Sequence, residues 1–117
     1  ASINGFTAHA SQVLYTASKH AVIGITRAAA LDLGPMEIRI NALAPGPILT
    51  DALIARVTQR HAEGGPTVED AIANLKSETA LKRLATETDV ANAAHFLASD
   101  ASKGMTGSVL PIEAGLR

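Results

Sequence analysis

The chain of 117 residues has no cysteine and no tryptophan, and aromatic residues make up only 3 % of it. The absence of cysteine excludes a disulfide framework and thiolate chemistry. A net charge of −1 provides no basic surface for nucleic acid. No apolar run is long enough to span a bilayer, and no charged segment followed by an apolar one opens the chain. We therefore expect a soluble, cytoplasmic protein with no nucleic-acid or membrane partner.

Apolar residues, by contrast, make up 47 % of the chain, which is enough to build the core of one small domain. The four histidines do not have the spacing of metal ligands, so we predict no metal site. They are His9, His20, His61 and His95. Since loops near a site often carry specificity, His9 has two interpretations: part of a substrate pocket or an ordinary surface residue.

The residues best suited to chemistry are Ser2, Tyr15 and Lys19, which are spaced as Ser-x12-Tyr-x3-Lys. Tyr15 and Lys19 are four residues apart and therefore share one face of a helix. An ammonium beside a phenol favours the phenolate, and such a tyrosine can exchange a proton with a carbonyl or alcohol oxygen. A serine hydroxyl can bind the same oxygen. This set suits hydride transfer beside a nicotinamide. The structural alternatives are an amphipathic core tyrosine and a solvated lysine.

Capping and apolar patterns predict that helices and strands alternate along the chain. Gly34 is expected just past the end of the first helix, at C′, with Pro35 as a breaker. That helix is apolar almost all round, so we expect a sheet on one side and a second subunit on the other. The predicted elements are a loop at 1–12, a helix from 11 or 12 to about 33, a strand at 37–44, a helix after Thr50, a loop at 61–66, a helix capped by Thr67 and Asp70, a helix capped by Thr86 or Thr88 with Val90, Ala93, Ala94 and Leu97 facing inward, and a strand at 108–112.

Several segments occur together in an order and spacing that resemble the C-terminal half of a classical short-chain dehydrogenase/reductase. They are ASING at 1–5, YTASK at 15–19, IRINALAPGPILT at 38–50, DVANAAHFLASD at 89–100, TG at 106–107 and VLPIEAG at 109–115. The resemblance covers nearly the whole chain. One departure is Glu113-Ala114-Gly115, where Asp-Gly-Gly is more usual in a region that supports the oligomer of many relatives.

The resemblance implies a Rossmann-like, doubly wound α/β sheet, of which residues 1–117 would form the C-terminal part of a single NAD(P)-binding domain. It implies an oxidoreductase that uses NAD or NADP to interconvert a small-molecule alcohol and a ketone, assembled as a homodimer or homotetramer. The family's glycine-rich TGxxxGxG turn and its Asn-Asn-Ala-Gly motif would lie upstream. We therefore expect a fragment of a longer enzyme, inactive in isolation. Residues 51–80 correspond to a variable segment that covers the substrate.

The resemblance also implies a role for each site residue. Tyr15 would be the general acid and base, Ser2 would hold the substrate oxygen, and Lys19 would bind the nicotinamide ribose and favour the tyrosinate. Ser11 and Ser18 are the competing serines.

In the turn that follows the predicted strand at 37–44, backbone atoms of Ile48 would contact the nicotinamide carboxamide. The full cofactor-binding set that the resemblance implies is Tyr15, Lys19, Pro45, Gly46, Ile48 and Thr50. Thr50 would bind the carboxamide or the diphosphate. Asn41, in the strand itself, has a structural interpretation.

Two interpretations without catalysis remain open. The first is a dimerising or regulatory fragment that associates with a full-length relative. The second is a product of a broken gene that exposes an unpaired sheet edge and aggregates.

Overall fold

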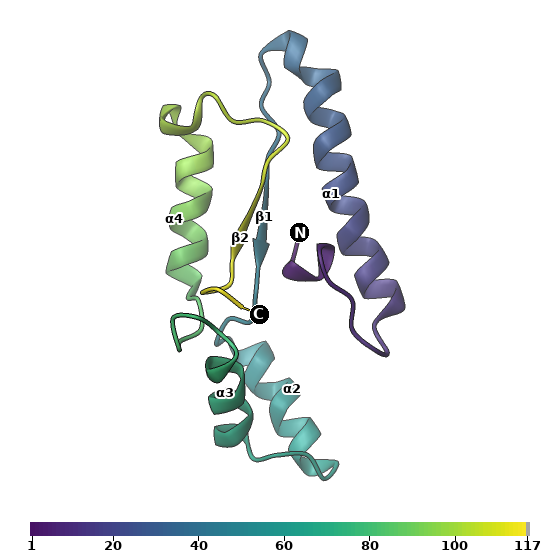
Figure 1. Ribbon diagram of the computed structural model, residues 1–117, viewed down its shortest axis with the longest axis vertical. Helices are drawn as coiled ribbons and strands as arrows, with labels where there is room; N and C mark the ends of the chain where they lie inside the picture. The colour runs from purple at the N-terminus through teal and green to yellow at the C-terminus, as the bar shows by residue number, and fades with distance from the viewer. Residues whose placement is uncertain (117) are drawn as a thin grey trace.

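Two short parallel strands form the centre of the structure, and helices flank them on both sides (Figure 1). The computed structural model describes residues 1–116. In chain order the elements are η1 (Ile3–Gly5), α1 (Val13–Leu33), η2 (Gly34–Met36), β1 (Ala42–Pro45), α2 (Asp51–Ala62), α3 (Val68–Ser77), α4 (Glu87–Ala98), η3 (Asp100–Ser102) and β2 (Val109–Ile112), where η marks a 3-10 helix.

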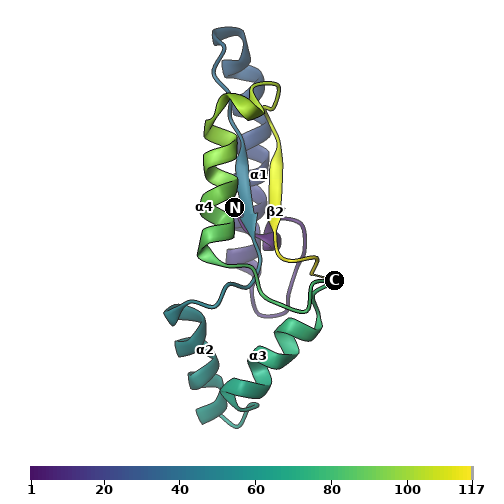
Figure 2. The same ribbon diagram turned by 90° about the vertical axis from the view of Figure 1, so that its left-hand side faces the viewer.

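The strands pair in parallel, with Ala42 opposite Val109 and Pro45 opposite Ile112. Parallel neighbours require a crossover, which α2, α3 and α4 supply here. Figures 1 and 2 show the two strands between α1 on one side and α4 on the other. Ala44 is completely buried, as expected for a parallel sheet covered on both faces. The predicted α/β class is therefore confirmed.

The strand predicted at 37–44 begins later, at Ala42. Its expected first half has no regular secondary structure and is held by the loop that leads into β2. The amide of Ile40 donates to Thr106 Oγ1 (3.1 Å), and its carbonyl accepts from the amide of Gly107 (2.6 Å). A threonine hydroxyl thus takes the place of a neighbouring strand, so the regular ladder starts two residues further on.

Gly34 directly follows the last residue of α1, Leu33, as predicted, but it does not have the left-handed conformation common at the ends of helices. Its φ is −55°, and the chain continues from α1 into η2, with Pro35 in the first positions of that turn. Proline suits the start of a helical turn because its φ is already helical and its missing N–H is not needed there. The left-handed residue is Glu37, with φ 58°, at the end of η2.

Threonine side chains cap three helices, as predicted. Thr50 accepts a bond from the amide of Leu53 at the start of α2, and Thr67 accepts one from the amide of Asp70 at the start of α3. The full reciprocal capping box forms at α4, between Thr86 and Asp89, which selects Thr86 over Thr88.

The face that α4 turns toward the sheet is narrower than predicted. Val90, Ala93 and Leu97 are half-buried, whereas Ala94, also predicted to face inward, is exposed. At 100° per residue Ala94 lies on one edge of the stripe formed by the other three residues. Its small side chain therefore remains outside the contact with the sheet.

Arg39 fastens the chain before β1 to the end of α4. Its guanidinium donates to the carbonyls of Leu97, Ser99, Ser102 and Met105 and to the hydroxyl of Ser102, over distances of 2.9 to 3.3 Å. The last carbonyls of a helix have no partner inside the helix, so this side chain acts as a cap from a distant part of the sequence.

The α2–α3 hairpin (residues 51–77) carries its own small apolar core. Leu53 and Val57 are buried with Leu84, and half-buried residues of α3 pack around them. The hairpin joins the rest of the molecule at two places. Ile48 forms a bridge with Ala85, and residues 79–81 bond to 114–116, with the amide of Ala80 donating to the carbonyl of Gly115 (2.8 Å).

One face of α1 packs on η1 and the strands, through Ile23, Thr26 and Ala30. Large apolar side chains on its other side are exposed, among them Leu14 (86 %) and Leu31 (80 %). The sheet cover predicted for this helix is present. The second subunit remains a prediction.

Candidate active site

Ser2 is held beside the start of α1 by a short chain of hydrogen bonds. Its Oγ accepts from the amide of Asn4 (3.2 Å) and so caps η1. The Asn4 side chain then donates to Gln12 Oε1 (2.8 Å), at the residue before α1. Because Ser2 Oγ is an acceptor in this arrangement, its hydroxyl hydrogen is available to another oxygen.

Gly5 allows η1 to lie directly against α1. A Cβ placed on it would be 2.5 Å from Ile23 Cδ1 and 3.0 Å from the carbonyl oxygen of Lys19. Neither distance is compatible with an ordinary side chain, so glycine sets how closely Ser2 approaches the helix that carries Tyr15 and Lys19.

Tyr15 and Lys19 lie one turn apart on the first part of α1, as the spacing predicts. The Lys19 Nζ is 5.1 Å from the centroid of the Tyr15 ring, within the range of a cation–π contact. Tyr15 is 49 % exposed, so its hydroxyl is accessible. The competing Ser18 donates instead to the carbonyl of Tyr15 (2.7 Å), a bond within the helix.

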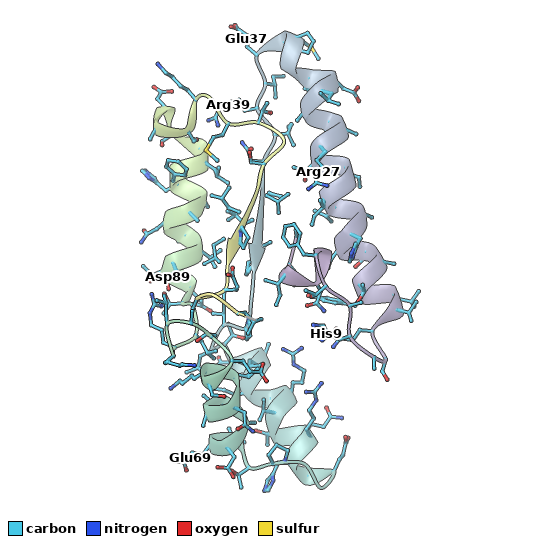
Figure 3. All side chains as sticks on the ribbon, in the orientation of Figure 1. His9, Arg27, Glu37, Arg39, Glu69 and Asp89 are labelled. Atoms are coloured by element: carbon cyan, nitrogen blue, oxygen red, sulfur yellow. The ribbon has the colours of Figure 1, made fainter. Side chains whose placement is uncertain are left out.

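A cleft of about 490 Å³ brings the predicted residues together. Ser2, Tyr15 and Gly46 line it, along with His9 from the loop before α1. Figure 3 shows His9 in that loop, on the side of the molecule where α2 lies. The α2–α3 hairpin supplies the opposite wall. Lys19 does not line the cleft; it contacts the Tyr15 ring, which does.

The turn after β1 places its residues in different surroundings. Pro45 ends the strand, and Gly46 donates its amide to the carbonyl of Ile112 (3.0 Å). Ile48 bridges to Ala85. Thr50 lines a second cavity of about 690 Å³, bounded by residues around 83–88. The predicted cofactor-binding residues of this turn therefore run from the Tyr15 cleft, at Gly46, to a neighbouring cavity, at Thr50.

Sequence reasoning missed several residues of the cleft wall. Asn4 and Gln12 support Ser2, and Arg56 and Arg60 line the cleft from α2. The four-residue spacing of the two arginines in a predicted helix is a signal that could have found them. The Asn4–Gln12 bond has no such signal, because it joins a turn to a helix start eight positions away.

Asp89, in the first turn of α4, is the N3 residue of the capping box with Thr86. Hydrogen bonds from the Thr86 amide and hydroxyl, and from the nearby Arg83 guanidinium, hold the pKa of this carboxyl below its usual value. The Arg83 guanidinium is 3.1 Å from the Asp89 carboxylate, and these two groups form the one ion pair found in residues 1–116.

Residues 1–116 contain no group of three histidine, aspartate or glutamate side chains that could hold a metal ion. No helix in the described region is sufficiently long and apolar to cross a membrane.

A nicotinamide cofactor fits the side chains present. Lys19 is half-buried, lies beside a phenol, and is not part of the Arg83–Asp89 ion pair. Its three N–H donors are the kind of group that binds sugar hydroxyls.

Comparison with known proteins identifies relatives of this chain. A family model described as "Enoyl-(Acyl carrier protein) reductase" matches residues 1–117. The 7alpha-hydroxysteroid dehydrogenase of Escherichia coli is 39 % identical over 86 % of the chain and 36 % of its own length. The chain therefore spans less than half the length of such relatives.

Solved structures give the same result. A short chain dehydrogenase family protein from Francisella tularensis has a TM-score of 0.90 and 34 % identity, over 97 % of this chain and 47 % of its own. Carveol dehydrogenase from Mycobacterium avium in complex with NAD has a TM-score of 0.87 and 34 % identity, over 98 % of this chain and 43 % of its own. These matches show that the chain belongs to the short-chain dehydrogenase/reductase family.

Proposed function

We propose that this chain forms the nicotinamide side of an NAD(P)-dependent oxidoreductase that interconverts an alcohol and a ketone by hydride transfer. The observation that carries the proposal is the meeting of Ser2 and Tyr15 in one cleft, with the Lys19 ammonium 5.1 Å from the Tyr15 ring. Two relatives are named for alcohols, a hydroxysteroid and carveol, which supports the same class of substrate.

In the proposed reaction, Tyr15 handles the proton. During reduction its hydroxyl donates a proton to the carbonyl oxygen, and during oxidation the tyrosinate takes a proton from the alcohol. The Ser2 hydroxyl donates a hydrogen bond to the same oxygen and fixes its position. The positive charge of Lys19 stabilises the tyrosinate each time it forms. The bound nicotinamide supplies or accepts the hydride.

The cofactor would be held by residues on both sides of β1. Lys19 would bind the nicotinamide ribose hydroxyls, and backbone atoms of Ile48 would contact the carboxamide. Pro45 and Gly46 would bind the cofactor beside it. Thr50, at the start of α2, would bind the carboxamide or the diphosphate, since helix starts favour anions. Residues 51–80 would form a lid over the substrate. The remainder of the cofactor site would come from the part of the family fold that these residues do not contain.

The test is an activity assay of the native polypeptide that carries these residues. We propose that this polypeptide is cytoplasmic. Alcohols and ketones are offered with NAD or NADP, and the nicotinamide absorbance is followed. Tyr15→Phe should abolish turnover and Ser2→Ala should lower kcat by roughly 100-fold or more, as for loss of one oxyanion donor. Ser18→Ala, a matched serine change beside the site, should leave kcat unchanged. Full activity of Tyr15→Phe would refute the proposed role.

A second candidate function is a non-catalytic fragment that associates with another copy of the fold. The exposed apolar residues of α1, such as Val13 and Ile25, favour it. In that case no alcohol or ketone is turned over, and Leu14→Glu disrupts association while Tyr15→Phe does not.

A further inference from the structure

Two arginines lie on the face of α2 that forms the wall of the Tyr15 cleft. Arg56 and Arg60 both line the cleft, as do Leu53 and Val57. At 100° per residue these four residues fall within about 100° of one another, so they form a single stripe. The apolar pair is buried at the base, whereas the two arginines are exposed. The buried Leu53 and Val57 therefore hold this face of α2 in place, and the two arginines present positive charge to the cleft.

The charge of the arginines is not neutralised within the described part of the chain. The ion pair there joins Arg83 to Asp89, on α4, and involves neither Arg56 nor Arg60. Glu78, at the end of α3, contributes the one carboxylate among the cleft-lining residues in 1–116. The lining thus carries two guanidinium groups against one carboxylate, which gives the cleft an excess of positive charge.

The helix dipole accounts for only one of the two arginines. Arg60 lies in the last turn of α2, where a cation interacts favourably with the helix dipole. Arg56 lies in the middle of the helix, where no such effect operates. The Cα atoms of residues four apart are about 6 Å apart along the helix axis, a spacing from which two long arginine side chains can reach one oxyanion.

The position of the pair indicates the substrate rather than the cofactor. Arg56 and Arg60 share their cleft with Ser2 and Tyr15, the residues proposed to hold the reacting oxygen. Gly46, proposed for the cofactor, also lines this cleft, whereas Thr50, proposed for the carboxamide or the anionic diphosphate, lines the separate cavity with Asp51 and Arg83. An anion bound by the pair would therefore belong to the molecule whose carbonyl or alcohol group lies at Tyr15.

We propose that Arg56 and Arg60 form an anion subsite that selects a carbonyl or alcohol substrate bearing an oxyanion, either a carboxylate or a phosphate. The inference rests on the proposed oxidoreductase function and names the substrate class of that same cleft. The planar guanidinium fork matches both groups through paired hydrogen bonds. The subsite binds a part of the substrate that does not react, so it acts on KM more than on kcat.

The experiment compares matched substrates on the native polypeptide that carries these residues. One series contains keto acids of increasing chain length and their methyl esters. The other contains dihydroxyacetone phosphate and dihydroxyacetone. Each compound is assayed with NADH and NADPH for the wild type, Arg56→Gln, Arg60→Gln and Arg56→Lys. Arg27→Gln, an exposed arginine on α1 that does not line the cleft, is the matched control (Figure 3).

We expect the wild type to prefer one anionic series over its neutral partners. Each Arg→Gln change should raise KM for the preferred anion roughly 10-fold, the value of one charge-assisted hydrogen bond, and leave KM for the neutral partner unchanged. Arg56→Lys should recover part of the loss. Whichever anionic series is preferred identifies the group. A purely structural role would change KM for both partners equally.

Three outcomes would overturn the inference, and they are distinguishable. If the neutral compounds are turned over as well as the anions and the variants match Arg27→Gln, the subsite is wrong and the oxidoreductase proposal stands. If the variants raise KM for NADH or NADPH instead, the pair binds the cofactor. If no compound of either series, and no simple alcohol or ketone, is turned over, the oxidoreductase proposal fails together with the subsite.

Discussion

Replacing Arg39 by methionine should destabilise the fold more than any exposed arginine change. The guanidinium makes five hydrogen bonds, two of them to Ser102, which is 2 % exposed. A hydrogen bond to a charged group contributes about 1.5–3 kcal/mol. The Ser102 carbonyl keeps its bond from the Met105 amide (2.8 Å), and the Ser102 hydroxyl still donates to the Leu97 and Ser99 carbonyls, so the loss is smaller than the sum of five such bonds. The methionine retains most of the aliphatic stem. We therefore expect Arg39→Met to lower the free energy of unfolding by about 2–4 kcal/mol.

Urea unfolding of the native polypeptide measures this effect, with Arg27→Met as the control. At the usual slopes, such a loss lowers the midpoint by about 1–2 M urea with little change in slope. The control, at an exposed position on α1, should stay within about 0.5 kcal/mol of the wild type. Equal midpoints for the two variants would show that water replaces the guanidinium at no cost, and the role assigned to Arg39 would be wrong.

Two further predictions concern the site and the capping of α4. Gly5→Ala should lower stability by about 1–3 kcal/mol and reduce kcat, because its Cβ would press on Ile23 and the Lys19 carbonyl and shift Ser2. Gly24→Ala, where a Cβ meets nothing within 4 Å, should instead be neutral or stabilising, and equal losses in thermal unfolding and kcat for both would contradict the packing argument. Asp89→Asn should lower stability at neutral pH. Since the folded-state pKa of Asp89 is lowered, its contribution is present above the ordinary carboxyl pKa and lost as pH falls through the folded value. The urea midpoints of the wild type and Asp89→Asn should therefore converge as the pH falls. The control is Glu87→Gln, a matched change in the same turn of α4, whose difference from the wild type should not follow this pattern. A difference between the wild type and Asp89→Asn that persists in acid would count against this origin.

Local features of the fold could be predicted from the sequence where a side chain interacts with residues only three or four positions away. The caps at Thr50, Thr67 and Thr86 follow from hydroxyl groups that reach amides three residues away. The pairing of Tyr15 with Lys19 follows equally from helix geometry. These predictions needed no knowledge of the rest of the chain.

Other features depend on contacts between distant segments and were not predictable in this way. The strand at 37–44 starts late because Ile40 bonds to Thr106 and Gly107, more than sixty positions away. Arg39 likewise finds its acceptors at the end of α4. The composition of the cleft wall depends on where the α2–α3 hairpin lies, and no periodicity within 51–77 specifies that position.

The two attachments of the α2–α3 hairpin have a mechanical consequence. One lies at the Ile48–Ala85 bridge and the other where 79–81 meets 114–116, and both are at the same end of the hairpin (Figure 1). The hairpin also packs on Leu84 through its own apolar core. None of these contacts is a bond between β1 and β2, whose pairing runs from Ala42–Val109 to Pro45–Ile112. A change in the position of the hairpin, and so in the width of the space beside Tyr15, therefore need not alter the pairing of the sheet.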